Sequence, residues 1–248
     1  LYISVSSFES ATETRRSTAE HISAEIRANS ADGVLLDLSN NVGGSLSEAV
    51  RVAGLFIGRG VITSASERSG KNTRYTDEDS GLAYSGPLVI AISRNTQSSA
   101  ELVAGALKEY ERAMLIGDDR TFGKGTGYHS YYQGKNNLYD VTDFRTFLPS
   151  GDSPQLCGVQ PHLQVTRNSD LENIGESCYS NALSNERGPY HMSPSSMTGA
   201  GVSWTGVAGK LDSVRRSFQQ RQRDSNGDRD KSSEYFEILA DLIQAPRR

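Results

Sequence analysis

The sequence predicts an α/β fold, in which a mixed sheet is flanked by helices and followed by a small C-terminal helical extension. Short apolar runs rich in β-branched residues, such as 34–38 and 87–92, are typical of strands buried on both faces of a sheet. Segments with apolar residues at helical spacing, such as 98–110, alternate with these runs. A chain of 248 residues is long enough to bury a sizeable core.

The first strand is expected at residues 1–5, where apolar and polar residues alternate. A helix is expected over 14–29, and a turn at Gly33 separates it from the strand 34–38. The apolar residues that share one face of this helix are Ala19, Ile22 and Ile26. The chain starts inside a strand, without an initiator methionine or an export signal, so we expect it to be part of a longer protein.

A glycine-containing loop, residues 39–45, joins the strand 34–38 to a second helix. The apolar residues of that helix are Leu46, Ala49, Val50 and Ala53. Backbone N–H groups of such a loop can face an anion, which in an acyl-transfer enzyme is the tetrahedral oxyanion. The alternative is an ordinary turn between a strand and a helix.

The central unit runs from Pro87 to Tyr128. A buried strand, 87–92, is followed by a polar turn and by Ser98-Ser99-Ala100-Glu101, which begins a helix. A second apolar run, 113–116, leads into a turn, 121–126, in which glycines flank Lys124. This unit therefore offers a serine at a helix N-terminus and a lysine on a glycine-bracketed turn.

A serine and a lysine in this arrangement have a chemical interpretation. A serine hydroxyl becomes a good nucleophile when a neighbouring base takes its proton, and a lysine is such a base when it is neutral. Burial in apolar surroundings lowers the pKa of a lysine, and Phe122 is placed to contribute to such surroundings. The pattern predicts a catalytic dyad of Ser98 and Lys124.

At these residues the sequence resembles the S41 peptidases, the tail-specific or C-terminal processing proteases. The resemblance lies in S-S-A-E with the following A-G-A-L-K-E-Y-E-R-A, and in T-F-G-K-G-T. A second landmark is D-L-S-N-N-V-G-G-S at 37–45, followed by L-S-E-A-V-R-V-A-G-L-F-I, and a third is G-V-Q-P at 158–161. These landmarks occur in the family's order within residues 1–185.

The resemblance implies a ClpP/crotonase-like protease core in residues 1–185, then a loop or linker, 186–206, and a helical segment, 207–248. By the family pattern, Ser98 is the nucleophile and Lys124 is the base. The two are one residue further apart in sequence than is usual in the family, and a small turn insertion at 118–120 accounts for the difference. The oxyanion would be held by Gly43 or Gly44 and by the backbone N–H of Ser99. Many relatives have a glutamine four residues after the lysine, where this chain has Tyr128. Either Tyr128 or Glu109 is then expected to orient the lysine, or the activity is weakened.

The activity that the resemblance implies is that of a serine endopeptidase which cleaves protein or peptide substrates near their C-termini and needs no cofactor. Relatives commonly act in the bacterial cell envelope, so a periplasmic or otherwise exported location is expected. Family members usually carry a PDZ domain, and no segment here would form one, so recruitment by a missing PDZ domain or an adaptor is expected. Three alternatives stay open. The first is a catalytically silent homologue that serves as a binding or scaffold module, and the second is a lipid- or retinoid-binding member of the same structural superfamily. The third is a latent enzyme, whose dyad is pulled apart until a partner engages.

Composition excludes several other classes of function. The net charge of −4 and the isoelectric point near 5.6 provide no basic footprint for nucleic acid. No apolar run approaches the roughly 20 residues that span a bilayer. The histidines, His21, His129, His162 and His191, lack the spacing of metal ligands. Of these, His129 is close to the dyad in sequence, and a Ser-His-Asp triad that uses it is the alternative to Lys124.

Three further expectations concern the remaining segments. Residues 64–86 are polar and predict a surface hairpin or loop. Short antiparallel strands with half-buried side chains are expected from Tyr128, Tyr131, Tyr132, Leu138, Tyr139 and Val141. Cys157 and Cys178 either form a disulfide that closes a loop of about 20 residues or remain two thiols.

Two helices are expected near the C-terminus, packed on the core or presenting a partner surface. Their apolar residues are Leu211, Val214 and Phe218 in the first, and Tyr235, Ile238, Leu239, Leu242 and Ile243 in the second. The segment 224–230 between them has some features of a calcium loop, but its glycine and its last ligand position depart from that pattern. A solvated acidic turn is the expectation there.

Overall fold

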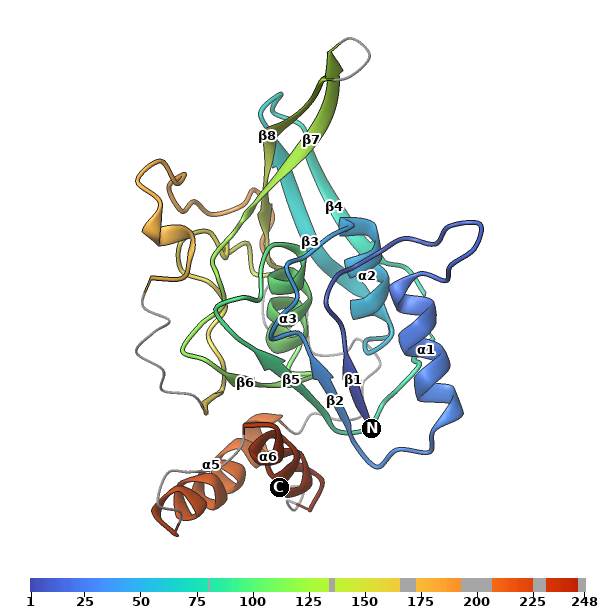
Figure 1. Ribbon diagram of the computed structural model, residues 1–248, viewed down its shortest axis with the longest axis vertical. Helices are drawn as coiled ribbons and strands as arrows, with labels where there is room; N and C mark the ends of the chain where they lie inside the picture. Colours follow the sequence, from blue (N-terminus) through green and yellow to red (C-terminus); the bar gives the residue numbers. More distant parts are fainter. Residues whose placement is uncertain (80, 134–136, 166–172, 193–206, 225–230, 245–248) are drawn as a thin grey trace.

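The computed structural model describes residues 1–79, 81–133, 137–165, 173–192, 207–224 and 231–244. It confirms the α/β class, with the strands divided between two sheets (Figure 1). No helix in these ranges is both long enough and apolar enough to cross a membrane.

A five-stranded parallel sheet forms the centre of the molecule. Its order is β1-β2-β5-β6-β9, and every neighbouring pair is parallel. The strands are β1 (Tyr2–Ser4), β2 (Val34–Asp37), β5 (Leu88–Ile92), β6 (Met114–Gly117) and β9 (Leu163–Gln164). All residues of β5 and β6 are buried, as the unbroken apolar runs predict for strands covered on both faces.

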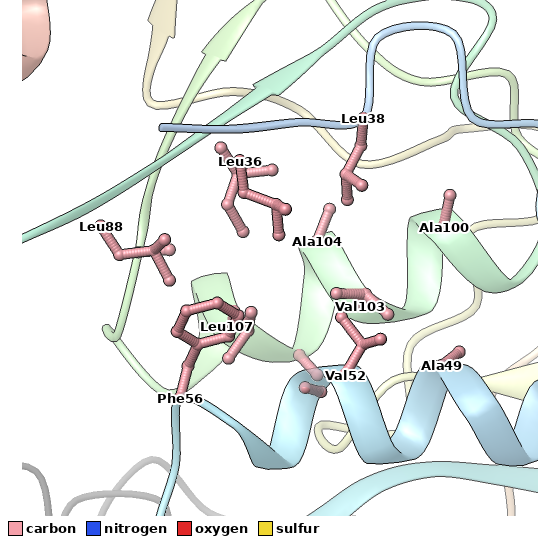
Figure 2. Close-up of a cluster of buried hydrophobic side chains, with 14 of the residues drawn as sticks. Leu36, Leu38, Ala49, Val52, Phe56, Leu88, Ala100, Val103, Ala104 and Leu107 are labelled. Carbon is pink, nitrogen blue, oxygen red and sulfur yellow. The ribbon is translucent and has the colours of Figure 1, made fainter. Parts of the chain in front are cut away.

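Three helices cover one face of this sheet: α1 (Thr18–Ala28), α2 (Leu46–Gly54) and α3 (Ser99–Glu109). Figure 2 shows the core between them, where Leu36 and Leu88 from the strands lie near Leu107 of α3 and Phe56, which follows α2. Alternate strand residues point to this side because side chains in a strand have a period of two. The core thereby fixes the position of α3, the helix that begins beside Ser98.

The opposite face is covered by the two C-terminal helices, α5 (Val207–Asp224) and α6 (Lys231–Gln244), which lie below the sheet in Figure 1. Strand residues Leu35, Val89 and Ile116 form a second buried cluster with Ile238 and Leu242 of α6. The C-terminal helices therefore pack on the sheet, as one of the two sequence expectations proposed. Residues 193–206 and 225–230, which include most of the expected linker and of the calcium-like segment, lie outside the described residues.

A second, antiparallel sheet has the order β4-β3-β8-β7 and lies against α2 and α3. Its strands are β3 (Gly60–Glu67), β4 (Asn72–Asp77), β7 (Thr126–Gln133) and β8 (Asn137–Phe147). The expected hairpin within 64–86 is confirmed, since β3 and β4 pair with each other. The strands β7 and β8 are longer than predicted, and they project from the molecule as a ribbon (Figure 1).

Three sequence expectations need correction. Helix α1 begins at Thr18, later than the predicted 14, because Ser17 caps it: the Ser17 hydroxyl accepts from the N–H of Glu20, and the Glu20 carboxylate accepts from the N–H of Ser17. Of the tyrosines of β7 and β8, Tyr128, Tyr131 and Tyr139 are about half exposed, as expected, but Tyr132 is 77% exposed. The disulfide expectation is wrong, since Cys157 and Cys178 are exposed and not joined.

Candidate active site

Three loops meet at the carboxyl ends of the parallel strands β2, β5 and β6. The backbone of Gln97, in the loop after β5, donates to the carbonyl of Asn41 in the loop after β2, with N and O 2.9 Å apart. On the other side, the N–H of Phe122 donates to the carbonyl of Thr96 at 3.0 Å. The Thr96 hydroxyl also donates to the Leu38 carbonyl at 2.8 Å. The carboxyl edge of a parallel sheet, a frequent location for ligand sites, is therefore tightly cross-linked here.

Ser98 lies at the sharp turn between β5 and α3, in a backbone conformation that L-residues seldom adopt. Its φ is 54° and its ψ is −125°. These values match the first central position of a type II′ turn, where glycine is usual. A non-glycine residue held there typically stores about 1–3 kcal/mol of strain, and such strain is concentrated at functional sites. The side chain of Ser98 remains partly accessible at the start of the helix.

The fully buried carboxylate of Glu101 connects the serine turn to the lysine turn. Its Oε2 accepts from the N–H of Ser98 at 3.0 Å and from the N–H of Lys124 at 2.7 Å. Its Oε1 accepts from the N–H of Gly123 at 2.7 Å and from the hydroxyl of Thr121. One side chain on the first turn of α3 thus holds the backbones of both predicted dyad residues.

The environment of Glu101 acts on its charge in two opposing directions. Burial raises the pKa of this carboxyl to about 7, while the hydrogen bonds from Thr121, Gly123, Lys124 and Ser98 favour the charged form and limit the rise. All four groups donate to the Glu101 oxygens, and an ionised carboxylate, which only accepts hydrogen bonds, can pair with all four. Sequence reasoning used Glu101 only as a landmark, although S-x-x-E is the capping-box pattern and predicts its bond to the N–H of Ser98.

The turn that carries Lys124 is fixed by neighbours on both sides. Gly123 has a φ of +94°, and its carbonyl accepts from the N–H of Leu156 at 2.8 Å. The N–H of Gly125 donates to Gln155 Oε1 at 2.9 Å. Lys124 Nζ lies 5.4 Å from the centre of the Tyr128 ring. Tyr128 is therefore in a position to orient Lys124.

Ser98 and Lys124 line one cavity of about 540 Å³, between the loops of the parallel sheet and one face of the antiparallel sheet. Other residues that border it include Gly44, Ser99, Tyr128, His129 and Phe144. The structure thus brings the predicted nucleophile, the predicted base and one predicted oxyanion glycine to the same space.

The backbone N–H groups predicted to hold the oxyanion differ in whether they already donate a hydrogen bond within the protein. The N–H of Gly43 donates to Asn41 Oδ1 at 2.8 Å, so this amide is occupied within its own loop. Among the described residues, neither the N–H of Gly44 nor that of Ser99 has an acceptor, and both residues border the cavity. A Cβ atom at Gly43 would lie 2.9 Å from Ser98 Cβ, so glycine permits the close approach of the two loops.

Glu109 and His129 were the other residues that the sequence suggested for orienting or replacing Lys124. The structure does not bring Glu109 to the site: it lies at the far end of α3, about 15 Å along the helix from Ser98, and its carboxylate accepts from the N–H and hydroxyl of Ser150. The interpretation of Glu109 as a lysine-orienting residue is therefore wrong. His129 does border the cavity, and its Nδ1 hydrogen-bonds to Asp143 Oδ2 at 3.0 Å. Among the described residues no group of acidic, histidine and cysteine side chains is placed to hold a metal ion.

Comparison with known proteins gives consistent matches. The tail-specific protease of Haemophilus influenzae is 32% identical over 169 residues, which are 64% of this chain and 24% of that protein. The chloroplastic C-terminal processing peptidase of Tetradesmus obliquus is 30% identical over 176 residues, which are 70% of this chain and 37% of that protein. The chain thus spans about a quarter to a third of the length of these relatives.

Among solved structures, a photosystem II D1 C-terminal processing protease matches with a TM-score of 0.57 and 30% identity, over 66% of this chain and 42% of that one. Mature CPAF, at 13% identity and a TM-score of 0.56, shares the fold over 91% of this chain. The model of peptidase family S41 matches residues 1–165. The chain therefore belongs to peptidase family S41.

Proposed function

We propose that this chain carries the catalytic centre of a serine endopeptidase that cleaves protein substrates near their C-termini through a Ser98–Lys124 dyad. The observation that carries this proposal is that Ser98 and Lys124 line one cavity while Glu101 holds the backbones of both. The names of the relatives, tail-specific and C-terminal processing proteases, support the substrate class. We further propose an exported, periplasmic location and recruitment by a PDZ domain or an adaptor, as the family resemblance implies.

The reaction proceeds in two halves. Lys124, as the neutral amine, takes the hydroxyl proton while Ser98 Oγ forms a bond to the substrate carbonyl carbon. The N–H groups of Gly44 and Ser99 stabilise the oxyanion of the tetrahedral intermediate. The C–N bond then breaks, Lys124 returns the proton to the leaving amine, and an acyl-enzyme remains. Water, activated by Lys124, hydrolyses the ester and regenerates Ser98.

A second base is supported by a specific observation. His129 borders the same cavity and hydrogen-bonds to Asp143, which is the orientation partner that a Ser-His-Asp triad needs. Lys124 is favoured because Glu101 ties its turn directly to that of Ser98, whereas His129 lies on the ribbon of β7 and is about half exposed. The presence of Ser98, Lys124 and His129 in the cavity lining does not support the lipid-binding alternative.

Cleavage of an unfolded protein such as casein tests the proposal, with wild-type protein compared with Ser98→Ala, Lys124→Ala and His129→Ala. We expect the first two variants to lose turnover while keeping a cooperative unfolding transition, and His129→Ala to retain its kcat. Loss of activity only in Ser98→Ala and His129→Ala would replace the dyad by a triad. Absence of cleavage by the wild type, together with no labelling of Ser98 by a fluorophosphonate probe, would favour the catalytically silent module.

A further inference from the structure

The ribbon formed by β7 and β8 leaves the body of the antiparallel sheet. Strand β3 pairs with β8 only from Phe144 to Phe147, while β7 and β8 continue to pair with each other as far as Gln133 and Asn137. Among the described residues no third strand covers this outer part. A two-stranded ribbon has no core of its own and both of its faces meet solvent, as Figure 1 shows.

One face of the ribbon, here called the cleft face, consists of His129, Tyr131, Tyr139 and Val141. The pairing register places these residues together, because His129 is opposite Val141 and Tyr131 is opposite Tyr139. They are 53% (side chain of His129), 50%, 48% and 46% exposed, in the order named. A contiguous apolar and aromatic patch that is exposed on a projecting element is a common mark of an interaction site.

The cleft face continues directly from the candidate active site. Phe144 is opposite Gly127, on the same side of the sheet as His129, and the centres of the Phe144 and His129 rings lie 5.4 Å apart. Phe144, Gly127 and His129 all border the cavity that contains Ser98 and Lys124. Both His129 and Tyr131 hydrogen-bond to Asp143, at 3.0 and 3.5 Å, and these bonds fix the orientation of the two side chains. An aromatic stripe therefore leads from the cavity to the outer ribbon.

The outer edge of β7 adds a second feature that suits a polypeptide. β7 is the last strand of its sheet, so its outer backbone N–H and C=O groups have no strand partner among the described residues. An extended peptide can pair with such an edge and present alternate side chains to one face. From Gly127 to Tyr131 the strand rises about 13 Å, which corresponds to roughly four residues of an extended substrate beyond the cavity.

We propose that the cleft face is a secondary binding site for an extended, apolar or aromatic segment of the polypeptide substrate, separate from the residues that enter the cavity. This inference rests on the proposed function for the identity of the ligand. Continuity with the cavity favours substrate over a second copy of the chain or a membrane surface, since neither of these would need a stripe that begins in the lining of the cavity that Ser98 borders.

Binding can be measured without cleavage. The test uses the full chain carrying Ser98→Ala and fluorescein-labelled casein, with the dissociation constant obtained from fluorescence anisotropy. We expect Tyr131→Ser/Tyr139→Ser to weaken casein binding about tenfold. The control is Tyr132→Ser/Leu138→Ser, which removes a directly opposed pair from the other face of the same ribbon, 77% and 53% exposed. It should change the dissociation constant less than twofold. Because the background is inactive, failure of the proposed catalytic mechanism would not affect this result.

In the active protein, the cleft-face double variant should raise KM for casein about tenfold with kcat nearly unchanged. Cleavage of a short peptide that fills only the cavity should not change. Equal effects of the two double variants on casein binding, or no effect of either, would overturn the proposal. The same holds if wild-type protein fails to bind casein but forms a dimer or binds anionic lipid vesicles in a manner that Tyr131→Ser/Tyr139→Ser abolishes.

Discussion

Replacing Glu101 by glutamine removes one acceptor atom from the carboxylate that joins the two halves of the site. If the new amide nitrogen takes the place of Oε2, it meets the N–H groups of Ser98 and Lys124, and both lose their acceptor. If it takes the place of Oε1, the hydroxyl of Thr121 can turn to accept, but the N–H of Gly123 is left unpaired. At least one buried donor is therefore unsatisfied, which costs about 1–3 kcal/mol of unfolding free energy.

The same substitution should reduce activity more than stability, because it loosens the backbones of Ser98 and Lys124 together. A displacement of about 1 Å between reacting groups can lower the rate by a factor of about 100. We would measure urea unfolding and casein cleavage of Glu101→Gln against wild type. Both the loss of stability and the loss of turnover are expected in this variant.

Glu109→Gln is the matched control, since it makes the same chemical change at the other end of α3. There the glutamine oxygen can accept from the N–H of Ser150 while its nitrogen donates to the Ser150 hydroxyl, so no backbone N–H is left unpaired. We expect a change of less than about 1 kcal/mol and full activity. If Glu101→Gln behaved like Glu109→Gln in both assays, the role assigned to Glu101 would be refuted.

Three further predictions concern the scaffold. Gly44→Ala should destabilise the protein by about 2 kcal/mol or more in urea unfolding, because the φ is +134° and the new Cβ would lie 2.3 Å from the Phe8 carbonyl oxygen; a neutral result would show that this loop adapts. Burial lowers the pKa of His162 from 6.5 to about 4, and the N–H of Leu115 donates to its Nδ1. The unfolded chain therefore binds this proton first, so the free energy of unfolding should fall by up to about 3 kcal/mol between pH 6.5 and pH 4. His162→Asn should remove that part of the pH dependence, and an unchanged slope would contradict it. Ile238→Ala should cost about 2–5 kcal/mol in thermal or urea unfolding, because Ile238 is fully buried between α6 and the parallel sheet, and a cost below about 1 kcal/mol would mean that α6 is not part of the core.

Local sequence patterns predicted the buried strands and the helices that cover them well, although the expected mixed sheet is divided into a parallel and an antiparallel sheet. The apolar runs at 34–38 and 87–92 are confirmed as β2 and β5, and the helical face of Ala19, Ile22 and Ile26 is buried as expected. These predictions succeed because a strand covered on both faces and an amphipathic helix each carry their burial pattern in neighbouring residues.

Failures occurred where burial or position depends on distant parts of the chain. Tyr132 was expected to be half-buried but is 77% exposed, because it lies in the outer ribbon, beyond the residues of β8 that pair with β3. No local pattern encodes the length of a neighbouring strand. Glu109 was placed near Lys124 by analogy, whereas the rise of α3 carries it three turns away. The candidate site itself was accessible from sequence because S-S-A-E and the glycine-bracketed lysine are contiguous motifs.

The strained turn at Ser98 and the four bonds to Glu101 are parts of one arrangement. A positive φ at a non-glycine residue disfavours the native turn, so other contacts must hold it in place. Glu101 does so through the N–H of Ser98, and its remaining bonds reach Thr121, Gly123 and Lys124 in the turn after β6. The contacts that hold the strained turn at Ser98 therefore also fix the turn of Lys124 relative to it. If the proposed dyad operates, a substrate that binds at this cavity would not need to supply the free energy for aligning these two turns, which leaves its contacts with the ribbon available for selectivity.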